Sequence, residues 1–259
     1  MTDSRPLILI VLAALASMAA LLVWLNGSNT GLFLTLNQAG AQLPDALWTN
    51  LTLVADTLFA IAVLLIAGSY RPQMLNQALV LLLLGTLVVH GFKNGLDVLR
   101  PAGVLDRDSF RIIGQVLKSH SFPSGHSFTA LSCAGLLFLN LNNRLTGGAV
   151  LLLGALAALS RIMVGAHWPL DVLVGGAAGL LLAVISVALV SRIAWLQANG
   201  LKFFTAILLT LASAALSVHQ DGYPHTDALA VGMSLLALGI AMQRIWRPFV
   251  RLCAEAFRR

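Results

Sequence analysis

The sequence has 259 residues, of which 58% are hydrophobic and only 10% are charged, and its mean hydropathy is +0.88. This composition excludes a globular protein that faces water on all sides, because such a surface needs many more polar and charged residues. The formal net charge of +6 does not indicate nucleic-acid binding, since no basic segment stands apart from the apolar runs.

Eight apolar runs have about the length of a bilayer crossing, and their Leu- and Ala-rich sequences lack period-2 alternation, which predicts helices. They cover residues 7–25, 51–69, 74–92, 125–141, 147–165, 170–191, 203–219 and 226–243. We interpret the first run as a membrane helix, because it is too long for the core of a signal peptide. The expected fold is all-α: a polytopic membrane helix bundle with a six-helix core in residues 1–192, followed by two more membrane helices and a basic tail in residues 193–259.

The Lys and Arg residues are divided unevenly between the two sides of this bundle. If both termini are cytoplasmic, ten basic residues lie on the cytoplasmic side: Arg5, Arg71, Arg144, Arg192, Lys202, Arg244, Arg247, Arg251, Arg258 and Arg259. The basic tail would then contact anionic lipid headgroups. The other six lie around the linker after the third run and at the outer end of the fifth: Lys93, Arg100, Arg107, Arg111, Lys118 and Arg161. Because outer loops are usually poor in basic residues, this local excess indicates a function for these charges.

Charged and polar residues at three helix ends, with the prolines and the glycine beside them, are expected on that same outer side. They are Lys93, Arg100 and Pro101; Pro123, Ser124, Gly125 and His126; and Ser160, Arg161, His167 and Asp171. Singly, each has an ordinary explanation, such as a headgroup anchor, a helix cap or a first-turn acid. Together they predict an anion site, because Lys and Arg neutralise a phosphate and free backbone N–H groups at a helix start bind it.

The two histidines suggest a reaction at this site. Asp171 follows His167 by four residues across a helix start, so its carboxylate can hold one ring nitrogen protonated. The other nitrogen of His167 is then free to act as a nucleophile. His126 would lie across the bound phosphate, where it could protonate a leaving oxygen.

The three segments K-x6-R-P (93–101), P-S-G-H (123–126) and S-R-x5-H-x3-D (160–171) resemble, in this order, the signature of the type 2 phosphatidic acid phosphatase (PAP2) superfamily, in its membrane lipid phosphatase branch. The resemblance implies that His167 forms a phosphohistidine, that Asp171 orients it, and that His126 serves as the general acid and then activates water. It also implies that the family's reaction needs no metal ion or other cofactor. The implied phosphate-binding residues are Lys93, Arg100, Ser124, Gly125 and Arg161, with Pro101, Pro123 and Ser160 in supporting roles.

The resemblance therefore implies a metal-independent membrane lipid phosphatase, expected in a bacterial inner membrane with its site facing the periplasm. Its substrate could be undecaprenyl diphosphate, phosphatidylglycerophosphate, phosphatidic acid or lipid A. A lipid-to-lipid phosphotransferase would use the same site. An anion transporter is less favoured, because the centres of the spans hold almost no charges. The sequence decides neither the lipid nor the oligomeric state.

Three further features of the sequence also lead to expectations. The linker around residues 108–120 has the apolar spacing of a short interfacial helix, with Phe110, Ile113 and Leu117 on one side. Asp56 is either an intramembrane partner of Arg161 or Arg100, or a helix cap. The loop between the last two spans is expected to be a polar turn rather than a metal site, although it contains four ligand-type residues: His219, Asp221, His225 and Asp227.

Overall fold

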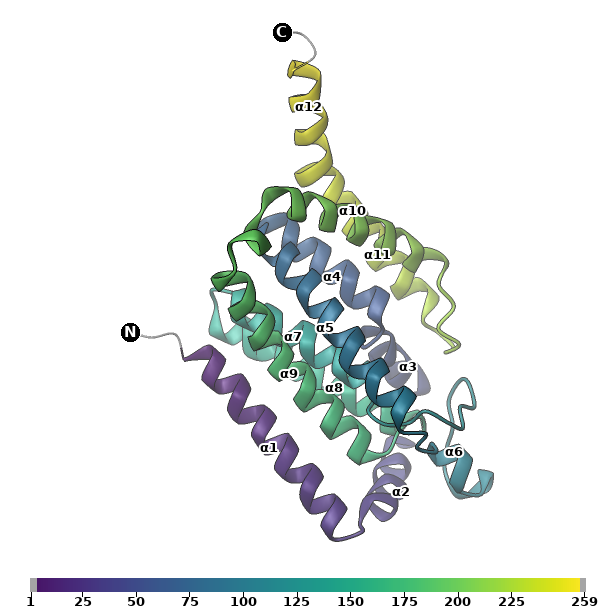
Figure 1. Ribbon diagram of the computed structural model, residues 1–259. Helices are drawn as coiled ribbons and strands as arrows, with labels where there is room; N and C mark the ends of the chain where they lie inside the picture. The colour runs from purple at the N-terminus through teal and green to yellow at the C-terminus, as the bar shows by residue number, and fades with distance from the viewer. Residues whose placement is uncertain (1–3, 257–259) are drawn as a thin grey trace.

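The computed structural model describes residues 4–256, and this part of the chain contains helices and no strand (Figure 1). Arg258 and Arg259 of the predicted basic tail lie outside the described residues. The helices are α1 (Arg5–Leu25), α2 (Asn29–Gly40), α3 (Asp45–Val54), α4 (Thr57–Tyr70), α5 (Gln73–Gly95), α6 (Pro101–Val104), α7 (Gly125–Asn140), α8 (Arg144–Met163), α9 (Pro169–Arg192), α10 (Asn199–Ala215), α11 (Asp227–Ala241) and α12 (Arg247–Ala256). Short 3-10 turns lie at 107–109, 194–197 and 216–218, and a π turn at 242–246 joins α11 to α12.

In the described chain, six helical segments are long and apolar enough to cross a membrane, which confirms the all-α membrane bundle. They are Arg5–Leu25, Gln73–Lys93, Arg144–Met163, Pro169–Arg192, Asn199–Val218 and Asp227–Glu255. The predicted span 125–141 corresponds to α7, which has 16 residues and is shorter than these six. The orientation of the termini and the division of the chain at residue 192 remain predictions.

The predicted span 51–69 is wrong as a single helix, because the chain bends by 60° between α3 and α4. Asp56 causes a new helix to begin there: its backbone is extended, and its Oδ1 accepts hydrogen bonds from the N–H groups of Leu58 (2.7 Å) and Phe59 (3.4 Å). The cap explanation for Asp56 is therefore confirmed. The prediction of an arginine partner for Asp56 is wrong, because Oδ2 of Asp56 lies 3.5 Å from Nε2 of His219 instead.

Helix α7 occupies the centre of the bundle, where it packs against α8 and α9. Two glycines of α9 bring its backbone against α7. A Cβ on Gly175 would lie 2.4 Å from the carbonyl oxygen of Ser124, and one on Gly179 would lie 2.5 Å from that of Phe128. Only glycine allows this approach, and the contact of these small residues fixes the position of the start of α7.

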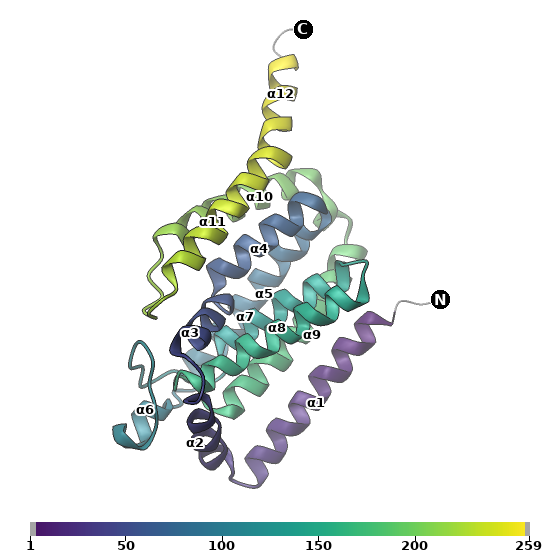
Figure 2. The same cartoon turned by 180° about the vertical axis from the view of Figure 1, so that it is seen from behind.

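The C-terminal pair α10 and α11 packs on α4, on the side of the bundle away from α1 (Figures 1 and 2). Leu209, Leu216 and Ala237 of this pair belong to the same apolar core as Leu64 and Leu65 of α4. Helix α12 continues α11 through the π turn and projects from the bundle. The pair is thus packed into the core of the molecule.

The interfacial helix predicted in the linker is wrong, because residues 110–124 form no helix. Their backbone groups bond to other parts of the chain. The N–H of Arg111 donates to Oδ1 of Asn37 (2.8 Å), and that of Ile113 donates to the carbonyl of Val164 (3.1 Å). Gly114 has a φ of +82°, which also breaks a helix. The linker is therefore held against the ends of α2 and α8.

Candidate functional site

The three predicted segments meet at one end of the bundle. Lys93 lies in the last turn of α5, Arg100 immediately precedes α6, and His126 lies in the first turn of α7. Arg161 lies in the last turn of α8, and His167 precedes α9 by two residues. Because α5 and α8 end where α7 and α9 begin, residues far apart in the sequence surround one site.

His167 is almost completely buried, with 1% of its surface exposed, and its Nδ1 lies 3.3 Å from Oδ2 of Asp171. The same carboxylate oxygen accepts hydrogen bonds from the N–H of Trp168 (3.0 Å) and from the hydroxyl of Ser121. A carboxylate with these donors favours a proton on Nδ1 of the imidazole. The lone pair of the ring then lies on Nε2, which is the arrangement that a histidine nucleophile needs.

Arg100 is buried beside this histidine. Its Nη1 donates to Nε2 of His167 (3.1 Å) and to the carbonyl of Ala166 (3.0 Å), while its Nε donates to the carbonyl of Ser119 (2.9 Å). Burial, followed by the charge of Arg161, lowers the pKa of Arg100 to about 10, so the guanidinium stays charged at neutral pH. An anion that faces Nε2 of His167 would therefore lie next to the guanidinium of Arg100.

The surroundings also keep His167 neutral. Burial is the largest influence that lowers its pKa well below 6.5, and the positive charges of Arg100 and Arg161 act in the same direction. A neutral imidazole keeps a lone pair on its unprotonated nitrogen, which a protonated ring would lose.

Two more cations complete the wall of the site. The ammonium of Lys93 lies 3.8 Å from the point where a Cβ on Gly125 would be, so it faces the open start of α7. Arg161 is 1% exposed, and its Nη1 donates to the hydroxyl of Tyr223 (2.9 Å). Its Nε is buried with no hydrogen-bond partner among the described residues. A buried guanidinium with a vacant donor is suited to an anionic ligand.

Several predicted site residues have structural contacts instead of open side chains. Ser124 is the N-cap of α7, and its Oγ accepts from the N–H (3.3 Å) and hydroxyl (2.8 Å) of Ser127. Ser160 donates to the carbonyl of Ala157 (2.7 Å) and lies 2.9 Å from Oγ1 of Thr52, so it fastens α3 to α8. Pro101 begins α6, and Pro123 is buried before the cap of α7. By fixing the ends of the helices, these residues determine where the cations and His126 lie.

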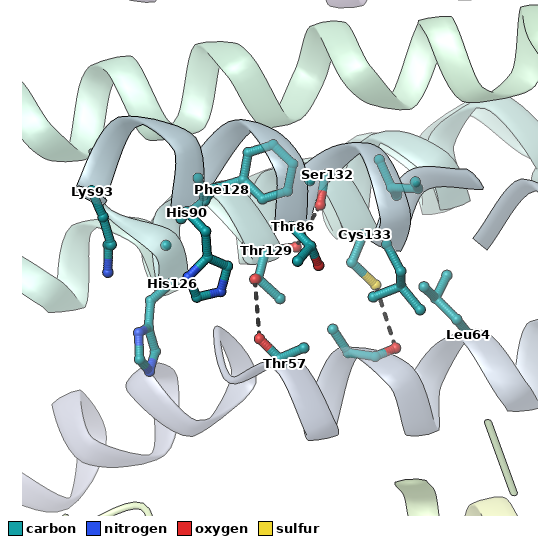
Figure 3. Close-up of a pocket in the computed structure, with 16 residues that line it drawn as sticks. Thr57, Leu64, Thr86, His90, Lys93, His126, Phe128, Thr129, Ser132 and Cys133 are labelled. Carbon is teal, nitrogen blue, oxygen red and sulfur yellow. Dashed lines mark hydrogen bonds between the residues drawn. The ribbon is translucent and has the colours of Figure 1, made fainter. Parts of the chain in front are cut away.

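A cavity of about 240 Å³ extends from this site between α4, α5 and α7. Lys93, His90 and His126 lie at one end of it, and Leu64 and Cys133 lie at the other (Figure 3). Most of its wall is apolar, with Leu64, Leu81, Leu82, Val89 and Phe128 contributing. The cavity thus joins a cationic end to an apolar interior.

Four residues of this region were not predicted from the sequence as part of the site: Ser121, His90, His219 and Tyr223. Ser121 lies in the stretch SFPSGHS, where a serine next to a turn has many ordinary roles. His90 precedes Lys93 by three residues, so it lies on the same side of α5, and this spacing could have identified it. His219 and Tyr223 lie in the predicted polar turn HQDGYPHTD, and their placement on the outer side was the available signal.

The bundle of apolar helices indicates an integral membrane protein, and at one end of it cations surround the buried histidine–aspartate pair. Residues 74–195 match the family model of the PAP2 superfamily. That stretch is just under half of the chain and contains all three motif segments, so the predicted resemblance to the PAP2 superfamily is confirmed.

Two curated relatives are similar over part of this chain. A lipid A 1-phosphatase of Porphyromonas gingivalis is 32% identical over 115 residues, which are 44% of this chain and 23% of the relative. YbjG of Escherichia coli, provisionally named an undecaprenyl-diphosphatase, is 38% identical over 84 residues, which are 32% of this chain and 39% of the relative. The chain thus spans less than half the length of the curated relatives that it matches.

Two solved structures share the fold. LpxE of Aquifex aeolicus is 27% identical with a TM-score of 0.51, and the match covers 62% of this chain and 94% of that one. A transmembrane PAP2-type phosphatidylglycerolphosphate phosphatase from Bacillus subtilis is 21% identical with a TM-score of 0.53, and the match covers 74% of this chain and 98% of that one. The second likeness is evidence for the fold alone.

Proposed function

We propose that this protein is a metal-independent membrane lipid phosphatase that works through a phosphohistidine. The observation that carries the proposal is the buried His167, whose Nδ1 faces Asp171 and whose Nε2 faces the guanidinium of Arg100. Arg100, Arg161 and Lys93 give the site three cations. We propose that these charges neutralise a phosphate and that no metal ion is needed. The names of the relatives support a phosphate carried by a lipid.

The proposed reaction has two steps. Nε2 of His167 attacks phosphorus, a P–N bond forms, the P–O bond to the lipid breaks, and His126, in its protonated form, gives its extra proton to the leaving oxygen. Water then attacks the phosphohistidine, His126 takes a proton from that water, and the P–N bond breaks to release inorganic phosphate. Before the first step, a phosphate oxygen must replace Nε2 as the acceptor for Nη1 of Arg100, which frees the lone pair of His167.

The substrate class follows from the cavity that joins the site. Leu64, Leu81, Leu82 and Phe128 line its interior, while Lys93 and His126 lie at the other end. A molecule with a phosphate headgroup and a hydrocarbon chain matches this change from cationic to apolar walls. We therefore propose a lipid phosphate or diphosphate of the undecaprenyl, glycerophospholipid or lipid A type.

We further propose a bacterial inner membrane with the site facing the periplasm. The excess of Lys and Arg on the opposite end of the helices supports this orientation, because basic loops remain in the cytoplasm. The substrates would then be reached from the outer leaflet.

The test is release of inorganic phosphate by the detergent-purified protein from undecaprenyl diphosphate, phosphatidylglycerophosphate, phosphatidic acid, lipid A and a soluble aryl phosphate, with EDTA present throughout. We expect release that survives EDTA and is lost in His167→Ala. The exposed His225 provides a matched control, and His225→Asn should retain activity. Equal, background release by the wild type and His167→Ala on every substrate would overturn the hydrolase. Transfer of phosphate from one lipid to another would then be measured.

A further inference from the structure

The loop between α10 and α11 contributes to the site, although it lies outside the part of the chain that matches the family model. That match ends at residue 195, and the loop covers residues 219–226. In both ribbon views the tip of the α10–α11 pair lies beside the linker that leads to α7 (Figures 1 and 2). The C-terminal pair is therefore in a position to supply residues to the reaction.

Tyr223 makes the direct connection. Its hydroxyl accepts a hydrogen bond from Nη1 of Arg161 (2.9 Å), and its ring centre lies 5.3 Å from Cζ of the same guanidinium. A guanidinium presents donors on separate edges, and Tyr223 occupies one of them. The buried Nε, on another edge, has no partner in the described chain. Tyr223 thus binds the guanidinium of Arg161 through Nη1 and leaves Nε–H available to a ligand.

The loop is fixed where it makes this contact. Oδ1 of Asp221 accepts from the N–H of Tyr223 (2.9 Å) and from the hydroxyl of Thr226 (3.0 Å). A Cβ on Gly114 of the linker would lie 2.6 Å from Cδ1 of Tyr223, and one on Gly222 would lie 2.3 Å from Nε2 of Gln115. Linker and loop are therefore packed without spare room, so the hydroxyl of Tyr223 has a defined position.

We propose that Tyr223 is a positioning residue: it holds the guanidinium of Arg161 by Nη1 so that Nε binds an oxygen of the phosphate. The inference rests on the proposed function for its role in turnover, because Arg161 binds the phosphate there. The α10–α11 pair then completes the anion site of this chain. Tyr223→Phe isolates this role, because it removes the hydroxyl and keeps the ring.

The experiment measures binding of inorganic phosphate and orthovanadate to the purified full chain, from the ligand-dependent rise in its unfolding midpoint. Loss of a hydrogen bond to a charged group predicts a dissociation constant that is roughly tenfold higher for Tyr223→Phe. Tyr70→Phe is the matched control: Tyr70 is the other tyrosine of the chain, and its ring lies 3.8 Å from Cζ of Arg244. It should bind phosphate as the wild type does.

A double-mutant cycle separates positioning from packing. In an Arg161→Lys background, Tyr223→Phe should have little further effect, because the guanidinium that it positions is absent. Equal effects of Tyr223→Phe in both backgrounds, or unchanged phosphate binding in the single variant, would overturn the proposal. If Tyr223→Phe does not fold, Asp221→Ala tests the same point, since it removes the acceptor for the N–H of Tyr223 and the hydroxyl of Thr226 and keeps the hydroxyl of Tyr223; unchanged binding would again refute the role.

The same data keep the two proposals apart. A wild type that binds phosphate but releases none from any lipid refutes the phosphatase and leaves the role of Tyr223 to be decided by the binding constants. A wild type that hydrolyses lipid phosphate, together with a Tyr223→Phe variant of unchanged phosphate affinity, refutes the role of Tyr223 alone. A wild type with no response to phosphate or orthovanadate refutes the positioning role.

Discussion

At the scale of single residues, the site depends on one oxygen atom. Oδ2 of Asp171 faces the imidazole of His167 and accepts from the backbone of Trp168 and from the hydroxyl of Ser121. Three donors around one acceptor leave the carboxylate few alternative positions. The orientation of His167 is thereby determined by groups on α9 and on the linker before α7, which ties the proposed nucleophile to the start of α7, where we propose that the phosphate binds.

Asp171→Asn should therefore reduce kcat strongly. An amide oxygen is uncharged, so even in the position of Oδ2 it stabilises the proton on Nδ1 of His167, and the positive charge that develops on the ring during attack, less than a carboxylate does. We expect kcat for lipid phosphate hydrolysis to fall by roughly 10²- to 10⁴-fold. Asp97→Asn is the control, because 68% of the Asp97 side chain is exposed. A variant of Asp171 within a few-fold of the wild type would contradict the orienting role.

The neutral state of His167 predicts a pH dependence. The pKa of its imidazole lies well below 6.5, first because of burial and then because of Arg100 and Arg161. In the proposed reaction, the neutral form is the one that attacks phosphorus. As pH falls from neutrality through 6.5, kcat/KM should therefore be retained, and it should be lost only at lower pH. The measurement is kcat/KM against pH, corrected for the ionisation of the substrate. If kcat/KM fell to half at pH 6.5 or above because of an enzyme group, the result would contradict a lowered pKa for His167.

Local spacing explains which site residues could be predicted from the sequence. His167 and Asp171 are four residues apart, so their contact is a property of one helix start. Tyr223 and Arg161 are separated by 62 residues, and their contact depends on how α10 and α11 pack against α4. No local pattern contains that information, which is why the loop was interpreted as an ordinary polar turn.

At the scale of elements, two departures from the sequence prediction have local causes. The run 51–69 is largely apolar, but Asp56 caps a new helix inside it, and this cap outweighs the high mean hydropathy of the run. The linker has the apolar spacing of a helix, but its N–H groups bond to Asn37 and to Val164. In both segments, hydrogen bonds determine the structure, and a hydropathy pattern does not show which groups will form them.

The approach of α9 to α7 gives a prediction at this scale. Gly179→Ala should lower the stability by about 1–3 kcal/mol, because its Cβ would lie 2.5 Å from the carbonyl oxygen of Phe128, a backbone atom that cannot move aside cheaply. The unfolding midpoint in detergent measures this effect. Gly239→Ala on α11 is the matched control, since a Cβ there meets no atom within 4 Å, and it should be neutral or slightly stabilising. Equal midpoints for the two variants would contradict the contact.

At the scale of the whole molecule, one end of the bundle gathers the functional groups. The ends of α5 and α8, the starts of α7 and α9, and the α10–α11 loop all lie there. The apolar cavity extends from this end into the bundle. A lipid phosphate could therefore place its headgroup among the cations with its chain in the apolar region, provided that this end faces the leaflet that contains the substrate.

The orientation of that end can be tested with cysteine labelling in spheroplasts. In a Cys253→Ser background, where the remaining Cys133 is buried in α7, Ser109→Cys places a thiol in the exposed linker at the end with the site. Gly200→Cys places one near the start of α10, where a Cβ meets no atom within 4 Å. We expect a membrane-impermeant maleimide to label Ser109→Cys in intact spheroplasts and Gly200→Cys only after permeabilisation, because the basic loops at the end with residue 200 should be cytoplasmic. The opposite pattern would place the site in the cytoplasm, and the substrate would then have to come from the inner leaflet.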